Sequence, residues 1–225
     1  MELTSRIMAD VDAGPPTSIQ RLVFAPALIT LALTLLRVQG ELAHWSKLWF
    51  STAPGGPGPL AAAMELLAPI FGAYFALRLA RLGDGPVNGR SAVGHAVLGV
   101  IILAFCAYFL MGEESTFDKA LGYILVSLAA LIQFNAWPQL ARTLTAYAYA
   151  ARIPVVVVML LAMLGHWGTH FDNVPPNHVH ASFVATFFAF SLLPQLVFWA
   201  SYTVVSGALL GTICAAFVDR GTPQT

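Results

Sequence analysis

The residues best suited to chemistry lie in one polar segment, GHWGTHFDNVPPNHVH, at positions 165–180. It holds four histidines, an aspartate and two consecutive prolines between two strongly apolar stretches. Neutral imidazole suits Zn, Cu, Fe or Ni, and a carboxylate can complete such a ligand set. We therefore consider a transition-metal site with five candidate ligands: His166, His170, Asp172, His178 and His180.

The spacing of the histidines permits this site without specifying it. His166 and His170 share one face if the preceding helix continues through them. His178 and His180 share a side only in an extended segment, which the prolines before them favour. The HExxH pattern of zinc proteases is not matched, because Trp167 stands where that pattern has glutamate. The alternative is that these rings anchor helix ends at a membrane surface and hydrogen-bond water.

Two ionisable residues next to or inside apolar stretches form a second candidate site. Glu65 lies in the run AAAMELLAP, and an ionisable side chain in the hydrocarbon costs up to about 3 kcal/mol and usually faces the bundle interior with a partner. Arg37 is the nearest candidate partner. Alternatively Glu65 is protonated, because burial disfavours the charged form of a carboxyl group. The depth of Glu65 matches that of the histidine segment, so we expect both to border one cavity.

Composition identifies the class of protein that carries these residues. Hydrophobic residues make up 58% of the chain and charged residues only 10%, whereas a soluble domain has about 25% charged residues. The sequence therefore predicts an integral membrane protein, with the lipid bilayer as its first partner. The formal net charge of +0 provides no basic surface for phosphates, which argues against a nucleic-acid partner.

Six apolar stretches have about the length of a membrane-spanning helix, which needs about 20 residues. They cover residues 22–38, 59–82, 92–111, 120–137, 153–167 and 194–218. Helices are expected because an open strand leaves unpaired backbone groups in lipid. We predict an all-α, polytopic transmembrane helix bundle of about six spans. Its domains are a tail at 1–20, a single transmembrane domain at 21–218 and a second tail at 219–225.

The distribution of Lys and Arg predicts the orientation, because positively charged loops stay on the cytoplasmic side. With the N-terminus inside, the cytoplasmic segments hold Arg6, Arg21, Arg78, Arg81, Arg90, Arg142, Arg152 and Arg220. The opposite side holds Arg37, Lys47 and Lys119. We expect a bacterial inner-membrane protein with both termini cytoplasmic and the histidine segment outside.

Two segments are predicted to form short interfacial helices on the outer side. Residues 41–50 (ELAHWSKLWF) interleave aromatic rings with His44 and Lys47, which suits a helix at headgroup level. Residues 181–193 are apolar and form either the second interfacial helix or part of the last span, because Pro194 can begin a new helix or kink a continuous one. Close helix approach is expected at Ser206 and Gly207 with Gly211, and at Gly94 with Gly99.

Three functional hypotheses follow, in order of preference. The first is a non-catalytic multi-pass protein, such as a subunit of a membrane complex or a homo-oligomer. The second is a transporter or a proton- or ligand-binding protein that uses Glu65 and the outer histidines. The third is a metal-dependent membrane enzyme with its site at the outer face.

Overall fold

The computed structural model describes residues 18–111, 116–175 and 182–219, and in this part of the chain the regular structure is all helical. Six of its helical segments are long and apolar enough to cross a membrane, which confirms the predicted class of fold. The first five in chain order are α2 (Ile19–Leu42), α3 (Pro59–Glu65) with α4 (Leu67–Arg81), α5 (Gly89–Met111), α6 (Thr116–Leu131) with α7 (Gln133–Ala136), and α8 (Pro138–Gly165). The sixth consists of α9 (Phe183–Phe187), the π-helical turns η2 (Phe188–Leu192) and η3 (Pro194–Phe198), and α10 (Trp199–Asp219).

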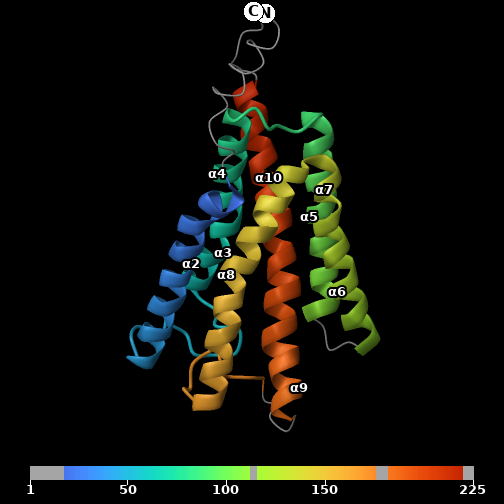
Figure 1. Ribbon diagram of the computed structural model, residues 1–225. Coiled ribbons are helices and arrows are strands. Elements are labelled where there is room, and N and C mark those ends of the chain that lie inside the picture. The colour runs from blue at the N-terminus through green and yellow to red at the C-terminus, as the bar shows by residue number, and fades with distance from the viewer. Residues whose placement is uncertain (1–17, 112–115, 176–181, 220–225) are drawn as a thin grey trace, which may run out of the picture.

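The helices run up and down between two ends of the bundle (Figure 1). Helix α2 begins and α10 ends at the same end, which we call the terminal end. There Trp137 donates its indole N–H to Asp84 over 3.0 Å, joining two turns. The opposite end, which we call the loop end, holds the loops 43–58 and 166–175, and Asn173 donates its side-chain amide to the carbonyl of Thr52 over 2.7 Å.

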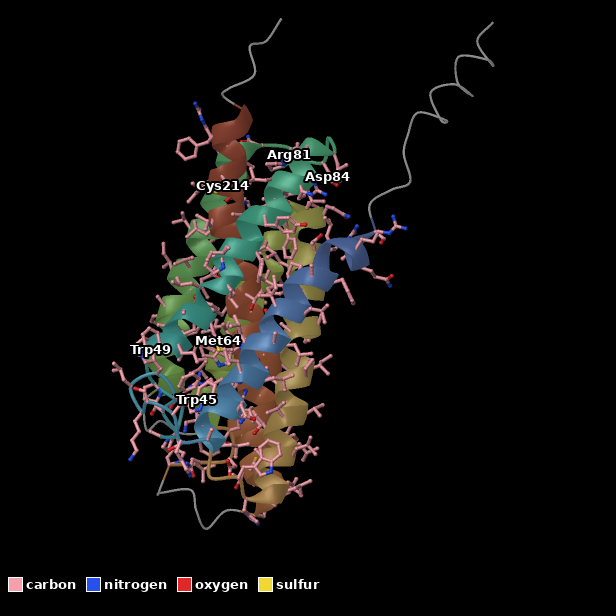
Figure 2. The ribbon with its side chains drawn as sticks, turned by 90° about the vertical axis from the view of Figure 1, so that its left-hand side faces the viewer. Trp45, Trp49, Met64, Arg81, Asp84 and Cys214 are labelled. Carbon is pink, nitrogen blue, oxygen red and sulfur yellow. The ribbon has the colours of Figure 1, made fainter. Side chains whose placement is uncertain are left out.

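Large apolar side chains cover the outside of the bundle. On α8, the exposed residues Ile153, Val157, Leu161 and Leu164 follow one another at helical spacing. A soluble monomer rarely exposes contiguous apolar surface on this scale. Figure 2 shows such side chains pointing outward along the length of the helices, as contact with lipid requires.

The tightest helix contact joins α4 to α10. A side chain added at Gly72 would overlap with the backbone of Gly207, and one at Gly211 would meet the Gly72 carbonyl at 2.9 Å. Small residues allow two helix backbones to approach in this way. The expected close approach is confirmed at Gly207 and Gly211. A side chain added at Gly99 would also meet Gln133 at 2.5 Å, but one at Gly94 would meet open space, so the expected close approach at Gly94 was wrong. Next to this contact the core contains Phe75, Trp137, Leu140, Leu144 and Tyr147.

Proline accounts for the interruptions in the spans. Pro69 has no amide hydrogen for the carbonyl of Glu65, and the second span is interrupted there, between α3 and α4. The freed Glu65 carbonyl accepts a hydrogen bond from the hydroxyl of Tyr202 at 3.4 Å. Trp137, before Pro138, is extended with ψ of 85° and separates α7 from α8. At Pro194 the chain adopts π-helical turns instead of breaking.

The first of the two segments expected at the loop end differs from an interfacial helix, and the second follows the alternative in which it belongs to the last span. Residues 43–58 form turns, because His44 is left-handed with φ of 51° and the loop folds back until the Phe50 ring covers Gly40. In the second segment, residues 183–193 continue into the final span, which runs from Phe183 to Phe217. The fifth span also begins earlier than expected, at Pro138, so that Arg152 lies inside it.

Candidate functional site

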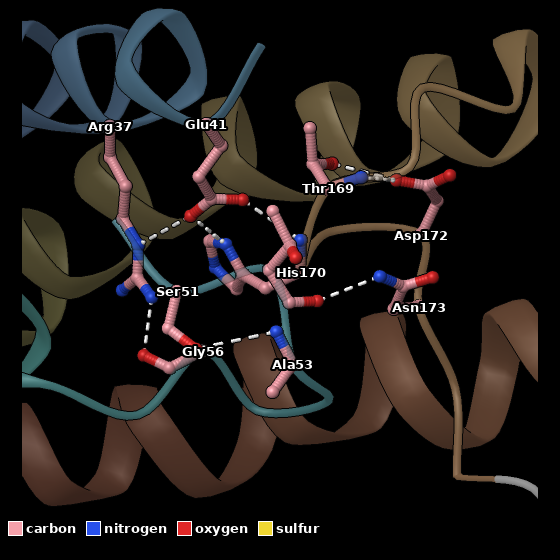
Figure 3. Close-up of polar contacts among 10 residues, drawn as sticks. Arg37, Glu41, Ser51, Ala53, Gly56, Thr169, His170, Asp172 and Asn173 are labelled. Atoms are coloured by element: carbon pink, nitrogen blue, oxygen red, sulfur yellow. Dashed lines mark hydrogen bonds and ion pairs between the residues drawn. The ribbon is translucent and has the colours of Figure 1, made fainter. Parts of the chain in front are cut away.

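The best-connected polar site in the described chain is centred on Glu41, in the last turn of α2 (Figure 3). Its carboxyl group is fully buried. Arg37 donates Nε–H over 3.0 Å, and His170 donates its backbone N–H over 2.8 Å and its Nδ1–H. Arg37 also donates Nη2–H to the carbonyl of Gly56. We call Arg37, Glu41, Gly56 and His170 the Glu41 cluster, which ties α2 to both loops of the loop end.

The local sequence explains this arrangement. Arg37 and Glu41 are one helical turn apart, so their side chains are neighbours on one face of α2. Gly56 has a φ of +54°, in the left-handed region where glycine carries no steric penalty. Any side chain at Gly56 would also overlap with the Arg37 guanidinium and the His170 ring. Glycine therefore allows the 43–58 loop to close over the ion pair.

The surroundings of His170 favour its neutral form. Burial lowers the pKa of its imidazole from the ordinary value near 6.5, and the positive charge of Arg37 lowers this pKa further. The hydrogen bond that His170 donates to Glu41 and the charges of Glu41 and Asp172 raise this pKa, but they do not reverse the shift. The hydrogen bond to Glu41 assigns the proton to Nδ1, which leaves Nε2 as an acceptor.

Two other predicted metal ligands of this segment, His166 and Asp172, interact mainly with backbone groups. His166 is the left-handed cap of α8, with φ of 49°, and its N–H bonds the Ala162 carbonyl. The helix therefore ends before His170, and the two imidazoles do not share a helical face. Asp172 accepts the N–H of Gly168 at 2.8 Å, and the N–H and hydroxyl of Thr169 at 2.7 Å each. Its carboxylate is thus engaged in closing the turn.

Next to the Glu41 cluster is a cavity of about 700 Å³. Residues of α2, α3, α8, the π-helical turns and both loops line it, together with Leu110 and Trp199. Its walls contain the apolar side chains Met64, Val155, Met159 and Met163. The polar residues that line the cavity are Thr30, Thr34, Arg37, Glu65, Arg152, His170, Asn173, Ser191 and Gln195.

Arg152 is the charged residue of the cavity that lies farthest from the ends of its helix. It is halfway along α8, roughly 20 Å from either end at 1.5 Å per residue. Its Nη1–H points to Oε1 of Gln195 at 3.4 Å, and its guanidinium lies 5.2 Å from the ring centre of Trp199. Glu65 acts on this charge electrostatically, but no ion pair within 4.0 Å joins them. The buried Nε has no hydrogen-bond partner among the described residues.

The structure brings one of the five predicted metal ligands, His170, to the same cavity as the second predicted site. Glu65, Arg37 and His170 all line the same cavity. The expected pairing of Arg37 with Glu65 is not found, because Arg37 forms its ion pair with Glu41, one helical turn away. Glu65 instead interacts electrostatically with Arg152.

The metal hypothesis stays a prediction. Of its five candidate ligands, His178 and His180 lie outside the described residues. His166 and Asp172 have the capping roles described above, and His170 bonds Glu41 through Nδ1. Across residues 18–111, 116–175 and 182–219 no group of three or more His, Cys, Asp or Glu side chains is placed to hold a metal ion.

Sequence reasoning missed Glu41 and Arg152. The signal for Glu41 was the spacing of Arg37 and Glu41, which places opposite charges on one helix face at the end of an apolar span. The signal for Arg152 was weaker. An apolar stretch that starts after an arginine can equally continue through it when the arginine faces the bundle interior.

No protein-family model matches the chain, and no curated protein or solved structure shows significant similarity to it. The class of protein therefore follows from its fold and its candidate site alone. The described chain is an all-helical bundle with six helices able to span a membrane, and it contains a cavity lined by both charged and apolar residues.

Proposed function

We propose that this protein binds a small amphipathic molecule in its cavity, as a ligand-binding membrane protein or transporter. The observation that carries the proposal is that Glu65, His170 and Arg152 border one space of about 700 Å³ inside an apolar bundle. Small-molecule sites have volumes of about 300–1,000 Å³ and combine apolar walls with a few polar groups. The three methionines of the wall suit an irregular apolar ligand, because their side chains are flexible.

A role as a non-catalytic subunit of a membrane complex or homo-oligomer is compatible with binding. Trp45 and Trp49, 45% and 48% exposed at the loop end, favour it as candidates for contact with another membrane protein or a second copy. Co-purification of a stoichiometric partner that Trp45→Ala and Trp49→Ala release would support this addition. A monodisperse monomer in mild detergent, without a partner, would argue against it.

A cavity-filling substitution tests the binding proposal. Val155 lines the cavity from α8, and Val157 on the same helix is 49% exposed on the outside. Val155→Phe should therefore reduce the space for a ligand, whereas Val157→Phe is the matched control with the same change in size. The probes are dodecanoic acid and dodecanol, each brominated next to its headgroup, because bromine quenches the fluorescence of a neighbouring tryptophan such as Trp199.

We expect saturable quenching in the native protein, little in Val155→Phe and normal quenching in Val157→Phe. The Trp199→Phe variant identifies the part of the signal that comes from the cavity. If neither probe quenches Trp199, or if both phenylalanine variants behave alike, the proposed function is wrong.

We further propose that the loop end faces the outside of a bacterial inner membrane and that both termini are cytoplasmic. Arg152 and Arg37 line the cavity inside the bundle, and leaving both out of the count keeps the charge bias in the same direction. Single cysteines replacing exposed Lys47 and Val87 test this in a protein without Cys106 and Cys214. An impermeant thiol reagent should label intact cells at position 47 only, and labelling at 87 alone would reverse the orientation.

The metal-dependent alternative has its own test. A transition metal present in stoichiometric amount after purification without chelator, and lost when His178 and His180 are replaced together, would support it. Metal-free protein that retains binding of the probes would exclude a metal from the proposed function.

A further inference from the structure

Arg152 has spare hydrogen-bonding capacity deep in the bundle. A guanidinium carries five N–H donors and no acceptor. The described residues provide one acceptor, the amide oxygen of Gln195 at 3.4 Å, and the face of the Trp199 ring. The Nε–H is buried without a partner. Buried polar groups are normally paired, so this donor needs an acceptor that the described chain does not provide.

The charge of Arg152 is also incompletely balanced. A guanidinium within the hydrocarbon depth of a membrane is costly and is normally compensated by a counter-charge. Arg37 has such a partner in Glu41, at 3.0 Å. Glu65 is the acid that faces Arg152 across the cavity, but it lies beyond ion-pair distance. The two arginines therefore differ, and Arg152 is the one open to a further anion.

The surroundings of Arg152 define what else the ligand contains. Val155 and Met159 follow it on the same face of α8, and Met64, Met163 and Phe190 add further apolar wall to the same cavity. A small hydrated anion would lose water against this wall without gaining apolar contacts. A molecule with an acid group at one end and an apolar remainder satisfies both parts of the cavity.

We propose that Arg152 binds the oxyanion headgroup, carboxylate or phosphate, of an amphipathic ligand whose apolar part lies against the methionines of the cavity. The planar guanidinium suits both headgroups, because its parallel N–H donors match two oxygens. Glu65 competes with the ligand for the same positive charge. This inference rests on the proposed function and specifies its ligand class.

The test compares headgroups on a constant chain. Brominated dodecanoate, dodecyl phosphate and dodecanol are titrated against the native protein, with Trp199 quenching as the readout. We expect at least one of the two acids to bind at least about tenfold more tightly than the alcohol, a difference of about 1.4 kcal/mol. Acetate and inorganic phosphate, which lack the chain, should not displace the acid at equal concentration. If they do, a free anion is the occupant and the amphipathic ligand class is wrong.

Variants of the charged groups locate the effect. Arg152→Gln should remove the preference for acid over alcohol and leave alcohol binding in place, which also shows that the variant is folded. Arg152→Lys should retain part of the preference, because charge remains while the paired donors are lost. Glu65→Gln should tighten acid binding, because the competing carboxylate is gone. Arg142→Gln is the control, since this exposed arginine of α8 lies outside the cavity.

The outcomes separate the two proposals. Equal binding of acids and alcohol, unchanged in Arg152→Gln, would refute the anion site while leaving the binding function in place. Quenching by none of the probes would refute both. A preference for acids that persists in Arg152→Gln would also refute the assignment to Arg152. So would a preference that is lost in the control Arg142→Gln to the same extent as in Arg152→Gln.

Discussion

Replacing Glu41 with glutamine should destabilise the protein by about 3–5 kcal/mol, the usual cost of removing one partner from a buried ion pair. The side chain of Glu41 is 0% exposed and that of Arg37 is 7% exposed, so water does not compensate for the loss. The amide still accepts with its oxygen, but its NH₂ group opposes one of the three incoming donors. Arg37 then remains buried without its counter-charge.

The double variant Arg37→Gln/Glu41→Gln sharpens this prediction. Because it removes both charges, it should cost less than the sum of the two single substitutions. Stability is measured by reversible unfolding in mixed micelles, followed by circular dichroism. Arg142→Gln, exposed on α8, should change stability by no more than about 0.5 kcal/mol. A similarly small effect of Glu41→Gln, or strict additivity in the double variant, would refute the account of the Glu41 cluster.

Three further predictions concern His170, the α4–α10 contact and the 166–175 loop. Because the folded state lowers the pKa of His170, the unfolded chain binds the proton first, so stability should fall as pH drops below about 6.5. His170→Gln should flatten this slope between about pH 6.5 and 5, and an unchanged slope would show that His170 does not cause it. Gly72→Val should lower the free energy of unfolding by at least about 2 kcal/mol, because the new side chain would overlap with Gly207. In the same unfolding assay Gly94→Ala, whose added methyl group meets open space, should change the free energy of unfolding little. Asp172→Ala should speed amide exchange at Gly168 and Thr169, and unchanged exchange would show that the carboxylate does not hold the turn.

Local properties of the sequence predicted much of the fold. The six spans follow from segment length and hydropathy, because only helices satisfy their own backbone in lipid. The close contact of Gly72 with Gly207 follows from the same local logic, since small residues are what a tight helix crossing needs. The shared depth of Glu65 and the histidine segment also indicated a common cavity.

The remaining features depend on contacts between distant parts of the chain. Glu41 meets His170 across 129 positions of sequence, and no local pattern predicts which acid a given histidine will meet. The depth of Arg152 was missed because a hydropathy pattern treats an arginine as the end of a span, whereas a cavity allows it to lie inside one. The continuity of the last helix through Pro194 depends on π-helical turns, which follow from packing around the proline.

Because of these π-helical turns, the deletion of a single residue can change the shape of the cavity. A π-helical turn holds more residues than an α-helical turn, so the stretch from Phe188 to Phe198 contains more chain than its length requires. Deleting Leu193 would remove one residue of this excess and let part of the segment relax toward α-helix, which would change the direction in which Phe190 and Ser191 point. Both side chains now line the cavity. The loss of one residue would therefore change which molecules fit the cavity, while α10 and its close contact with α4 stay in place.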